Sequence, residues 1–305
     1  MKLHKGLGRQ IRIFSYSFVI CLTCACDPDP KPGAGGVAEF ESTPEKSAIA
    51  PGIIDEASGL APSQNMDGFL WTIQDSGNLA SLYLISKDGK SIKEFNVPGA
   101  TNHDWEDVAI GPGPDSGIQY LYIGETGNNN QPVTPTNIVY RIPEITDQNG
   151  SFAAASLEKI TFKYPDGPRD SEALMVDPGT KDIIIVSKEA TETGIYRLPF
   201  PQSTSETITA EKVGTIPGVF IVTSGDISGD GSEILIRTYL AAYYWKRKDG
   251  ETIGNALSRA SDKQLSVALE PQGEAISFDR QANGFYTISE KSNASSVSLN
   301  YYKRK

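Results

Sequence analysis

Residues 102–128 decide the fold of this chain. They begin Asn102-His103-Asp104-Trp105-Glu106-Asp107-Val108-Ala109-Ile110 and, after a Gly/Pro turn, continue Tyr120-Leu121-Tyr122-Ile123-Gly124-Glu125-Thr126-Gly127-Asn128. A polar, acidic segment precedes a short apolar strand, and a turn, a second apolar strand and another acidic segment follow it. The same pattern recurs along the chain with different residues. Recurrence of that kind is typical of repeat architectures.

Five units follow the pattern, and each opens with an acidic or small polar patch and a strand. These first strands are expected at 56–60, 104–108, 170–174, 223–227 and 272–276. Hairpin turn residues follow, and second strands are expected at 70–73, 121–123, 183–186, 234–236 and 285–288. Third strands carry tyrosine and are expected at 82–84, 139–143, 195–199, 243–245 and 299–302. Fourth strands are expected at 92–97, 158–164, 212–216 and 264–269.

The fifth unit ends after its third strand. The segment Val37–Thr43 alternates like a strand and precedes the first unit, so we expect it to supply the missing fourth strand. Four-stranded units arranged radially and closed in this way form a β-propeller, which protects its sheet edges. The sequence therefore predicts an all-β fold, a single propeller of five blades. Six blades are the alternative if the long second unit hides another blade, and an irregular β-sandwich is the remaining one.

The N-terminal residues have the pattern of an export signal. Lys2, Lys5, Arg9 and Arg12 precede a short apolar run that ends in small residues and cysteine. This resembles a bacterial lipoprotein signal with Cys26 as the lipidated residue, and an ordinary signal peptide is the alternative. We expect a signal at 1–25, a Pro/Gly-rich tether at 26–36 and the propeller at 37–305. The protein would then be exported and lipid-anchored in the bacterial cell envelope, at the outer membrane on its periplasmic or surface side.

Charge and cysteine content limit the possible partners. Removal of residues 1–25 leaves 24 of the 28 Lys and Arg residues against 38 Asp and Glu, a net charge of about −14. Nucleic acid is excluded as a partner, because its binding requires basic residues that neutralise phosphates. All three cysteines lie at positions 21–26, so the propeller has no disulfide. We expect a monomer.

The topology of a propeller brings polar patches from all five units together. In an up-and-down blade, the connection entering the first strand and the one leaving the second strand lie on the same face. The entering patches contain Glu56, Ser58, His103, Asp104, Glu106, Arg169, Asp170, Glu172, Ser224, Asp226 and Glu274. The leaving patches contain Asp75, Ser76, Glu125, Thr126, Lys188, Glu189, Arg237, Thr238, Ser289 and Glu290. The sequence thus predicts an acidic channel mouth with a few cations in it.

Carboxylates that point at a common centre must take up protons, pair with cations or hold a metal. Oxygen ligands without cysteine favour Ca²⁺ or Mg²⁺. The alternative is a structural collar, in which the acids bond to neighbouring backbone amides or to Arg169, Lys188 and Arg237. His103 is the single histidine after residue 25. It is a candidate phosphate contact or general acid, or else a mouth residue bonded to a carboxylate.

The ligand-binding candidates come from the entering and leaving patches and include an expected exposed aromatic, Trp105. They are Asp75, His103, Asp104, Trp105, Glu106, Arg169, Lys188 and Arg237.

One repeat carries a resemblance to known proteins: Glu274-Ala275-Ile276, followed by Gly284-Phe285-Tyr286-Thr287-Ile288-Ser289-Glu290. It is similar to exported bacterial propellers of the phytase-related esterase-like and SdiA-regulated groups, and more loosely to NHL and gluconolactonase-type propellers. The segments Tyr-Arg-Ile-Pro (140–143) and Tyr-Arg-Leu-Pro (196–199) resemble those of uncharacterised Bacteroidetes-type envelope lipoproteins. In the phytase and lactonase groups, mouth acids hold calcium for work on phosphoesters or lactones. The resemblance implies as metal ligands Glu106, Glu125, Glu172, Glu274 and Glu290.

Two functions remain open from the sequence. The first is a non-enzymatic envelope lipoprotein whose acidic mouth binds a small ligand, a glycan or a protein partner. The second is a Ca²⁺- or Mg²⁺-dependent hydrolase of phosphoesters or lactones that uses the same mouth, with His103 or a spare glutamate as the proton carrier. The clustered Lys and Arg residues expected for a highly phosphorylated substrate are missing from the sequence.

Overall fold

The computed structural model describes residues 36–128 and 135–305, and the statements that follow refer to these residues. The predicted signal, the lipidation site Cys26 and nearly all of the predicted tether lie outside them. Residues 37–305 form one compact unit. No helix in the described part of the chain is both long enough and apolar enough to cross a membrane.

Five sheets make up this unit, and each contains one blade of four antiparallel strands. Blade 1 comprises β2 (Ala57–Pro62), β3 (Phe69–Gln74), β4 (Ser81–Ser86) and β5 (Ile92–Asn96). Blade 2 comprises β6 (Trp105–Pro112), β7 (Gln119–Glu125), β8 (Asn137–Pro143) and β9 (Glu158–Lys163). Blade 3 comprises β10 (Ser171–Val176), β11 (Ile183–Ser187), β12 (Thr193–Leu198) and β14 (Glu211–Ile216).

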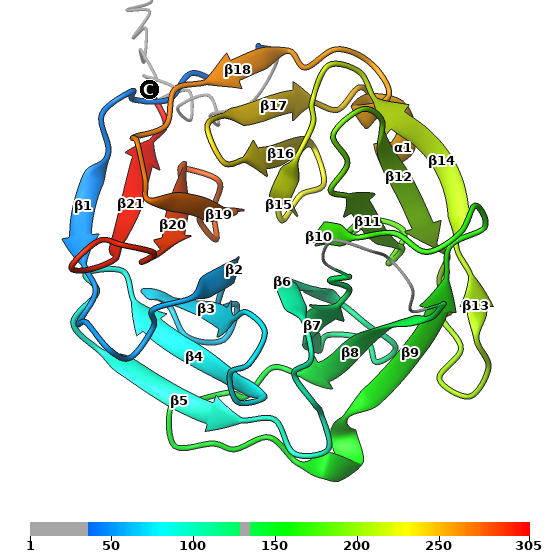
Figure 1. The fold of residues 1–305 in the computed structure, drawn as a ribbon, viewed down its shortest axis with the longest axis horizontal. Coiled ribbons are helices and arrows are strands. Elements are labelled where there is room, and N and C mark those ends of the chain that lie inside the picture. The colour runs from blue at the N-terminus through cyan, green and yellow to red at the C-terminus, as the bar shows by residue number, and fades with distance from the viewer. Residues whose placement is uncertain (1–35, 129–134) are drawn as a thin grey trace, which may run out of the picture. The chain divides into compact units, whose positions relative to one another are not determined.

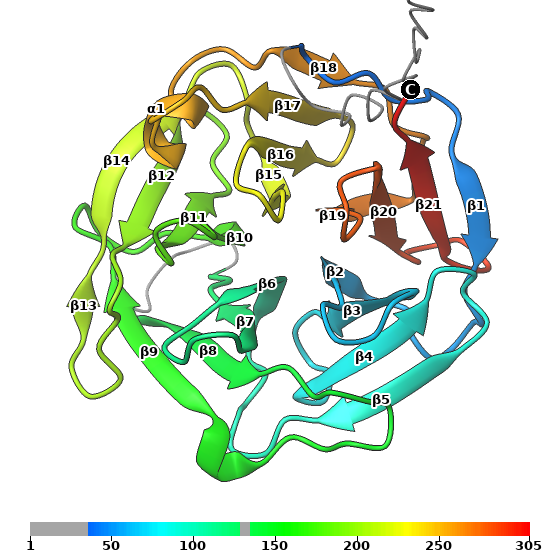
Figure 2. The same ribbon diagram turned by 180° about the vertical axis from the view of Figure 1, so that it is seen from behind.

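The last two blades complete the ring. Blade 4 comprises β15 (Val222–Ile227), β16 (Glu233–Thr238), β17 (Ala242–Lys246) and β18 (Lys263–Leu265). Blade 5 comprises β19 (Gln272–Phe278), β20 (Gly284–Glu290), β21 (Ser298–Lys303) and, from the other end of the unit, β1 (Glu45–Ala48). The five first strands lie nearest the centre in both face-on views (Figure 1, Figure 2). The five-bladed prediction is therefore confirmed, and the six-bladed and sandwich alternatives are wrong.

Each gap between neighbouring blades is filled by its own apolar cluster. Between blades 1 and 2, for example, Trp71 and Leu84 pack with Val108 and Ile123, all of them buried. Equivalent clusters lie between blades 2 and 3, 3 and 4, 4 and 5, and 5 and 1. Burial of apolar surface on both faces of a blade explains why its strands are rich in Val, Ile and Tyr. The fifth cluster joins the last blade to the first.

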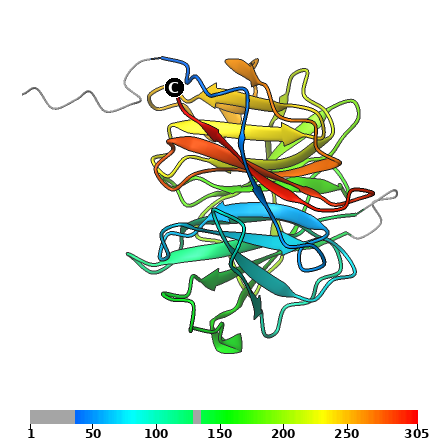
Figure 3. The ribbon, with the colours of Figure 1, turned by 90° about the vertical axis from the view of Figure 1, so that its left-hand side faces the viewer.

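The ring closes as predicted, but through a different segment. The closing strand is β1, paired antiparallel with β21 from Glu45 opposite Tyr301 to Ala48 opposite Ser298 (Figure 3). The predicted closing strand, Val37–Thr43, makes only an isolated bridge, between Phe40 and Arg304. The Phe40 ring instead packs edge-on against Tyr244 and Phe285, in the gap between blades 4 and 5. This burial holds the segment across the two blades.

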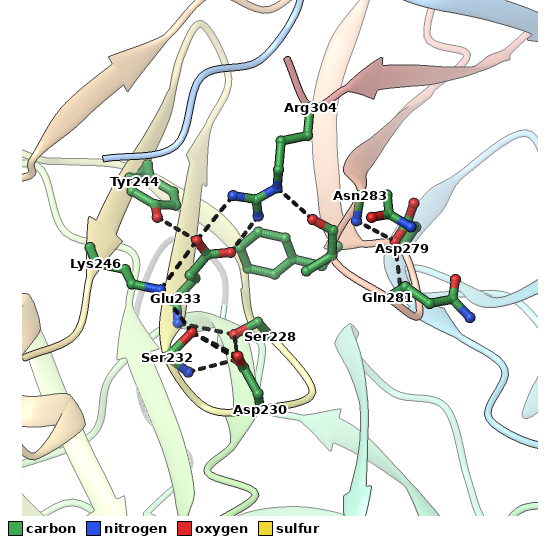
Figure 4. Close-up of polar contacts among 12 residues, drawn as sticks. Ser228, Asp230, Ser232, Glu233, Tyr244, Lys246, Asp279, Gln281, Asn283 and Arg304 are labelled. Carbon is green, nitrogen blue, oxygen red and sulfur yellow. Dashed lines mark hydrogen bonds and ion pairs between the residues drawn. The ribbon is translucent and has the colours of Figure 1, made fainter. Parts of the chain in front are cut away.

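The face opposite the mouth holds a polar network that supports this closure (Figure 4). Glu233, at the start of β16, accepts hydrogen bonds from the Tyr244 hydroxyl at 2.6 Å and from the Arg304 guanidinium. Arg304 follows β21, so the pair links blade 5 to blade 4. In the neighbouring turn, Asp230 accepts from the backbone and hydroxyl of Ser232, as expected of a hairpin turn.

Three short elements were not predicted. The helix α1 (Ile253–Leu257) begins at Thr252, whose side chain accepts from the backbone N–H of Asn255. Its buried Ile253 and Leu257 pack with the cluster between blades 3 and 4. The two-residue strand β13 (Ile208–Thr209) adds to β9 in parallel, and η1 (Ala154–Ser156) is a single 3₁₀ turn in a segment whose sequence has weak helical character.

Candidate functional site

A β-bulge near the mouth end of every first strand orients the side chains of the candidate site. In β6 the pairing with β7 shifts between Trp105 and Asp107, so Glu106 is the extra residue. The same shift makes Glu172 the extra residue in β10 and Glu274 the extra residue in β19. The equivalent shifts in β2 and β15 fall between Ala57 and Leu60 and between Val222 and Ser224. A bulge redirects a side chain away from the regular alternation of a strand, and here it places three glutamates at equivalent positions.

Asp107 joins three blades just below these glutamates. The side chain is buried, and Oδ2 accepts hydrogen bonds from the Leu174 N–H at 3.1 Å and the Ser224 hydroxyl at 3.1 Å. Burial raises the pKa of Asp107 well above its usual range. Blade 1 approaches equally closely, because a Cβ at Gly59 would collide with the backbone of Asp107 and Val108. The inner strands of blades 1, 2, 3 and 4 therefore meet at the level of Asp107.

Glu106 belongs to two groups of converging carboxylates. Oxygens of Asp75, Asp104 and Glu106 lie within 4.8 Å of one another, and so do oxygens of Glu106, Asp170 and Glu172. The five residues come from the end of β3 and from the starts of β6 and β10, so blades 1, 2 and 3 all contribute. We call these five residues the carboxylate cluster.

The Glu106 side chain has unused bonding capacity. It is 3% exposed, and in residues 36–128 and 135–305 its buried Oε1 has no hydrogen-bond partner. A buried charged oxygen without a partner is costly, so such an atom calls for an explanation. The space beside it is kept by Gly127, where a Cβ would collide with Glu106 Oε1 and with the Asp104 carboxylate.

Four carboxylates of the cluster have raised pKa values. For Glu106 the main cause is burial, followed by repulsion from Glu172 and Asp75. Burial also raises the pKa of Glu172, Asp75 and Asp170. On the blade 5 side, burial raises the pKa of Glu274 and of Glu290 to about 7. Without a bound cation, protons would therefore occupy part of the mouth at neutral pH.

The three predicted cations pair with acids. Lys188 forms an ion pair with Glu172, and its ammonium lies 5.1 Å from the centre of the Tyr239 ring. Burial opposes the charge of Lys188, but attraction to Glu172 outweighs it and raises the pKa of Lys188. Arg169 bridges Glu189 at 3.0 Å and Asp166 at 3.1 Å.

Arg237 was predicted to bind ligand at the mouth, and the structure corrects this prediction. Its side chain is fully buried and paired with Glu270, which the sequence did not single out. Gly273 lies so close that a Cβ there would collide with the guanidinium. The Arg237 side chain therefore packs within the ring.

The two ends of the stretch 102–128 meet, as predicted. The backbone N–H groups of His103 and Asp104 donate to the Glu125 carboxylate at distances of 3.1 and 2.7 Å. Beside them lies a cavity of about 620 Å³, lined among the described residues by His103, Asp104, Glu125, Gly127, Asn128, Thr136, Asn137, Ile138 and Thr161. His103 thus lines the same cavity as Asp104 of the carboxylate cluster.

The prediction that the Trp105 ring is exposed at the mouth is also corrected. The ring is fully buried among the apolar residues between blades 1 and 2, and its indole N–H donates to the Thr101 carbonyl at 2.8 Å. Flanking acids suggested exposure, but the bulge at Glu106 turns the acid to the mouth and leaves Trp105 in the core.

The predicted metal ligands divide into two groups. Glu106 and Glu172 lie in the carboxylate cluster, whereas Glu125, Glu274 and Glu290 belong to neither group of converging oxygens. The other members of the carboxylate cluster are Asp75, Asp104 and Asp170. All three had been assigned to the mouth from the topology, but only distances could show that they converge.

The fold and the site define an all-β five-bladed propeller with an acidic mouth. Neither a protein-family model nor a curated protein sequence matches the chain. Among solved structures, the chain is similar to the Dos1 propeller, with a TM-score of 0.38 and 11% identity, over 81% of this chain and 68% of that one. It is also similar to a chain of a nidogen/laminin complex, with a TM-score of 0.45 and 10% identity, over 80% of this chain and 74% of that one.

These likenesses concern the fold alone. The five-bladed assignment rests on the sheets of this chain, and the resemblance to the phytase-related and SdiA-regulated groups stays a prediction.

Proposed function

We propose that this protein is a cation-dependent binding module. The carboxylate cluster would hold a divalent cation, Ca²⁺ in preference to Mg²⁺, and the mouth would bind an oxygen-rich small ligand or a glycan beside it. One observation carries the proposal: Glu106 Oε1 is buried and without a partner in the described chain, at the point shared by two groups of converging carboxylates.

The donor set fits calcium. Five carboxylates can supply the six to eight oxygens that Ca²⁺ accepts in irregular geometry, whereas Mg²⁺ requires near-octahedral geometry and retains water. Asp75, Glu106 and Asp170 form no ion pair with any described residue. Burial is the main cause of their raised pKa values, and a bound cation would stabilise their charged forms there. Lys188 neutralises part of the charge of Glu172, so the other four carboxylates would contribute most.

The proposal is tested by titrating the purified protein with CaCl₂ in a calorimeter and by melting it with EDTA or with millimolar Ca²⁺. A ligand at about a hundred times its Kd stabilises the folded state by about 2.7 kcal/mol. We expect Ca²⁺ to raise the melting temperature of the wild type and of Glu206→Gln, a matched change at an exposed residue opposite the mouth. Glu106→Gln should abolish the rise. An equal rise in Glu106→Gln would rule out this site.

A second candidate, a Ca²⁺- or Mg²⁺-dependent hydrolase of phosphoesters or lactones, is favoured by the cavity beside the cluster. His103 lines that cavity and is exposed, and it would be the residue that donates a proton to a leaving oxygen. When bound, a divalent cation supplies Lewis-acid polarisation of the scissile group. Hydrolysis of aryl phosphates or lactones that is lost in both His103→Gln and Glu106→Gln would support this candidate. Hydrolysis that survives both changes would exclude this site.

We also propose that the protein acts as an exported, lipid-anchored monomer of the cell envelope. Support comes from the sequence alone: a basic and apolar start, cysteine at position 26 and a Pro/Gly-rich tether. Incorporation of labelled palmitate by bacteria expressing the protein should be lost in Cys26→Ser and retained in Cys24→Ser. Retained labelling in Cys26→Ser would show that another residue carries the lipid.

A further inference from the structure

Exposed apolar side chains form an arc on the mouth face. They are Ile53, Leu79, Phe220, Leu240 and Leu269, and the three leucines are 71%, 80% and 90% exposed. Each lies in a loop that enters a first strand or leaves a second strand, and these loops share the mouth face. The other large apolar residues exposed in the described chain, Val37 and Ile118, lie outside these loops. We call the five residues the apolar arc.

The apolar arc covers one side of the rim. Phe220 and Leu240 belong to the mouth loops of blade 4, Leu269 to blade 5, and Ile53 and Leu79 to blade 1. These blades are neighbours in the ring (Figure 1). The described parts of the mouth loops of blades 2 and 3 expose no large apolar residue. Single exposed apolar residues are ordinary, whereas several of them in loops on one side of one face are a feature that interaction surfaces share.

Three carboxylates lie along the inner edge of the apolar arc. Glu274 and Glu290 come from β19 and β20, and Glu56 directly precedes β2. None of them forms an ion pair within the described chain. Two of them accept hydrogen bonds from side-chain amides: Gln272 donates to Glu274 at 2.9 Å and Asn78 to Glu56 at 2.6 Å.

These three carboxylates belong to neither group of converging oxygens. A cation held in the carboxylate cluster would therefore not bridge them, and the positive charge that acts on Glu274 and Glu290 from nearby is that of Lys188.

We propose that the apolar arc, with the exposed Glu56 and the half-buried Glu290 at its inner edge, docks a protein partner through a segment in which Lys or Arg is flanked by apolar residues. An extended cation suits carboxylates that are too widely spaced to share one metal ion, because a guanidinium or ammonium donates several hydrogen bonds at once. Apolar flanking residues would cover the exposed leucines. Burial of these apolar side chains against one another would favour binding.

Charge favours a basic protein segment over a second copy of the chain and over an anionic lipid surface. A second copy of the chain would bring two acidic mouths together, and the chain as a whole has a net charge of −10. An anionic lipid surface would be repelled for the same reason. The surface extends over blades 4, 5 and 1, shares with the cation site the β3–β4 loop that holds Asp75 and Leu79, and needs no metal. The inference therefore stands apart from the proposed function.

The test uses a phage-displayed library of short random peptides, selected against the wild-type protein in EDTA. We expect the selected peptides to carry Lys or Arg beside Leu, Ile, Val or Phe. For synthetic copies measured by fluorescence polarisation, Leu240→Ser with Leu269→Ser should raise the Kd about tenfold or more. Glu290→Gln should raise it about fivefold or more. Ile118→Ser, the matched apolar change on the opposite face, and Glu106→Gln should leave it unchanged.

Several results would overturn the proposal. They are a selection that yields no binder, binders that lack basic residues, and binders whose Kd is the same in the Leu240 and Leu269 variants. Loss of binding in Glu106→Gln would place the peptides at the cation site instead. Self-association in sedimentation that is lost in Leu240→Ser would show that the arc binds a second copy of the chain. Flotation with phosphatidylethanolamine and phosphatidylglycerol vesicles that is lost in Leu240→Ser would show that it binds a lipid surface.

Discussion

Replacement of Glu274 by glutamine should stabilise the protein at alkaline pH. Glu274 is 4% exposed, and its burial raises the pKa from the usual 4.5 to about 7. An acid whose folded-state pKa is raised favours the folded state when protonated. Its contribution is complete below about pH 4.5 and is lost as the pH rises through about 7. The wild type should therefore become less stable across this window, and Glu274→Gln should escape part of the loss.

The size of the effect follows from the two pKa values. A difference of about 2.5 corresponds to about 3.5 kcal/mol at about 1.4 kcal/mol per pH unit. Because repulsion among the mouth acids is shared, we expect about 1–3 kcal/mol from this residue. Glutamine keeps an acceptor for the Gln272 amide, which donates to Glu274 Oε1 at 2.9 Å. The change therefore removes charge without removing that hydrogen bond.

Urea denaturation in EDTA at pH 5, 7 and 8.5 measures the effect. Glu274→Gln should match the wild type at pH 5 and exceed it by about 1–3 kcal/mol at pH 8.5. The control Glu206→Gln, an exposed residue far from the mouth, should follow the wild type at every pH. A wild type whose stability rises from pH 5 to pH 8.5, with no gain in Glu274→Gln, would refute the reasoning.

Three further changes test the packing around the mouth and the ring closure. Gly127→Ala should weaken Ca²⁺ binding in calorimetry about tenfold or more, because its Cβ would collide with Glu106 Oε1 and the Asp104 carboxylate, and an unchanged Kd would contradict this. Arg237→Met should lower the free energy of unfolding by about 3–5 kcal/mol, since it leaves Glu270 buried and unpaired, and Arg237→Met with Glu270→Gln should recover most of that loss. Phe40→Ala should cost about 3–5 kcal/mol in urea denaturation, because the ring fills the gap between blades 4 and 5, whereas a loss below about 1 kcal/mol would show that the segment does not hold the ring closed.

The blades could be predicted from the sequence because the signals are local. Each strand alternates or is uniformly apolar over a few residues, and turn residues such as those of 113–117 separate the strands. Up-and-down topology then fixes which loops share a face, so the acidic mouth followed from the blade pattern. The hydrogen bond of 3.1 Å from the His103 backbone N–H to the Glu125 carboxylate confirms that these two segments lie close together.

Other features depend on contacts between distant residues. The closing strand β1 exists only by pairing with β21, so the stronger alternation of Val37–Thr43 was misleading. Arg237 meets Glu270 from another loop, and nothing local announces that pair. The bulge in β6 decides that Glu106 faces the mouth while Trp105 is buried. Alternation alone cannot locate a bulge, because one extra residue reverses the facing of every residue beyond it.

The central claim is that the carboxylate cluster binds a divalent cation through Glu106. Crystals grown with Mn²⁺ as an anomalous scatterer in place of Ca²⁺ would test it most directly. We expect one strong anomalous peak at metal–oxygen bonding distance, about 2.0–2.6 Å, from Glu106 Oε1 and from oxygens of both carboxylate groups. Addition of Ca²⁺ should displace the peak. An ordered Glu106 carboxylate with no peak beside it, in crystals soaked at millimolar Mn²⁺, would contradict the claim.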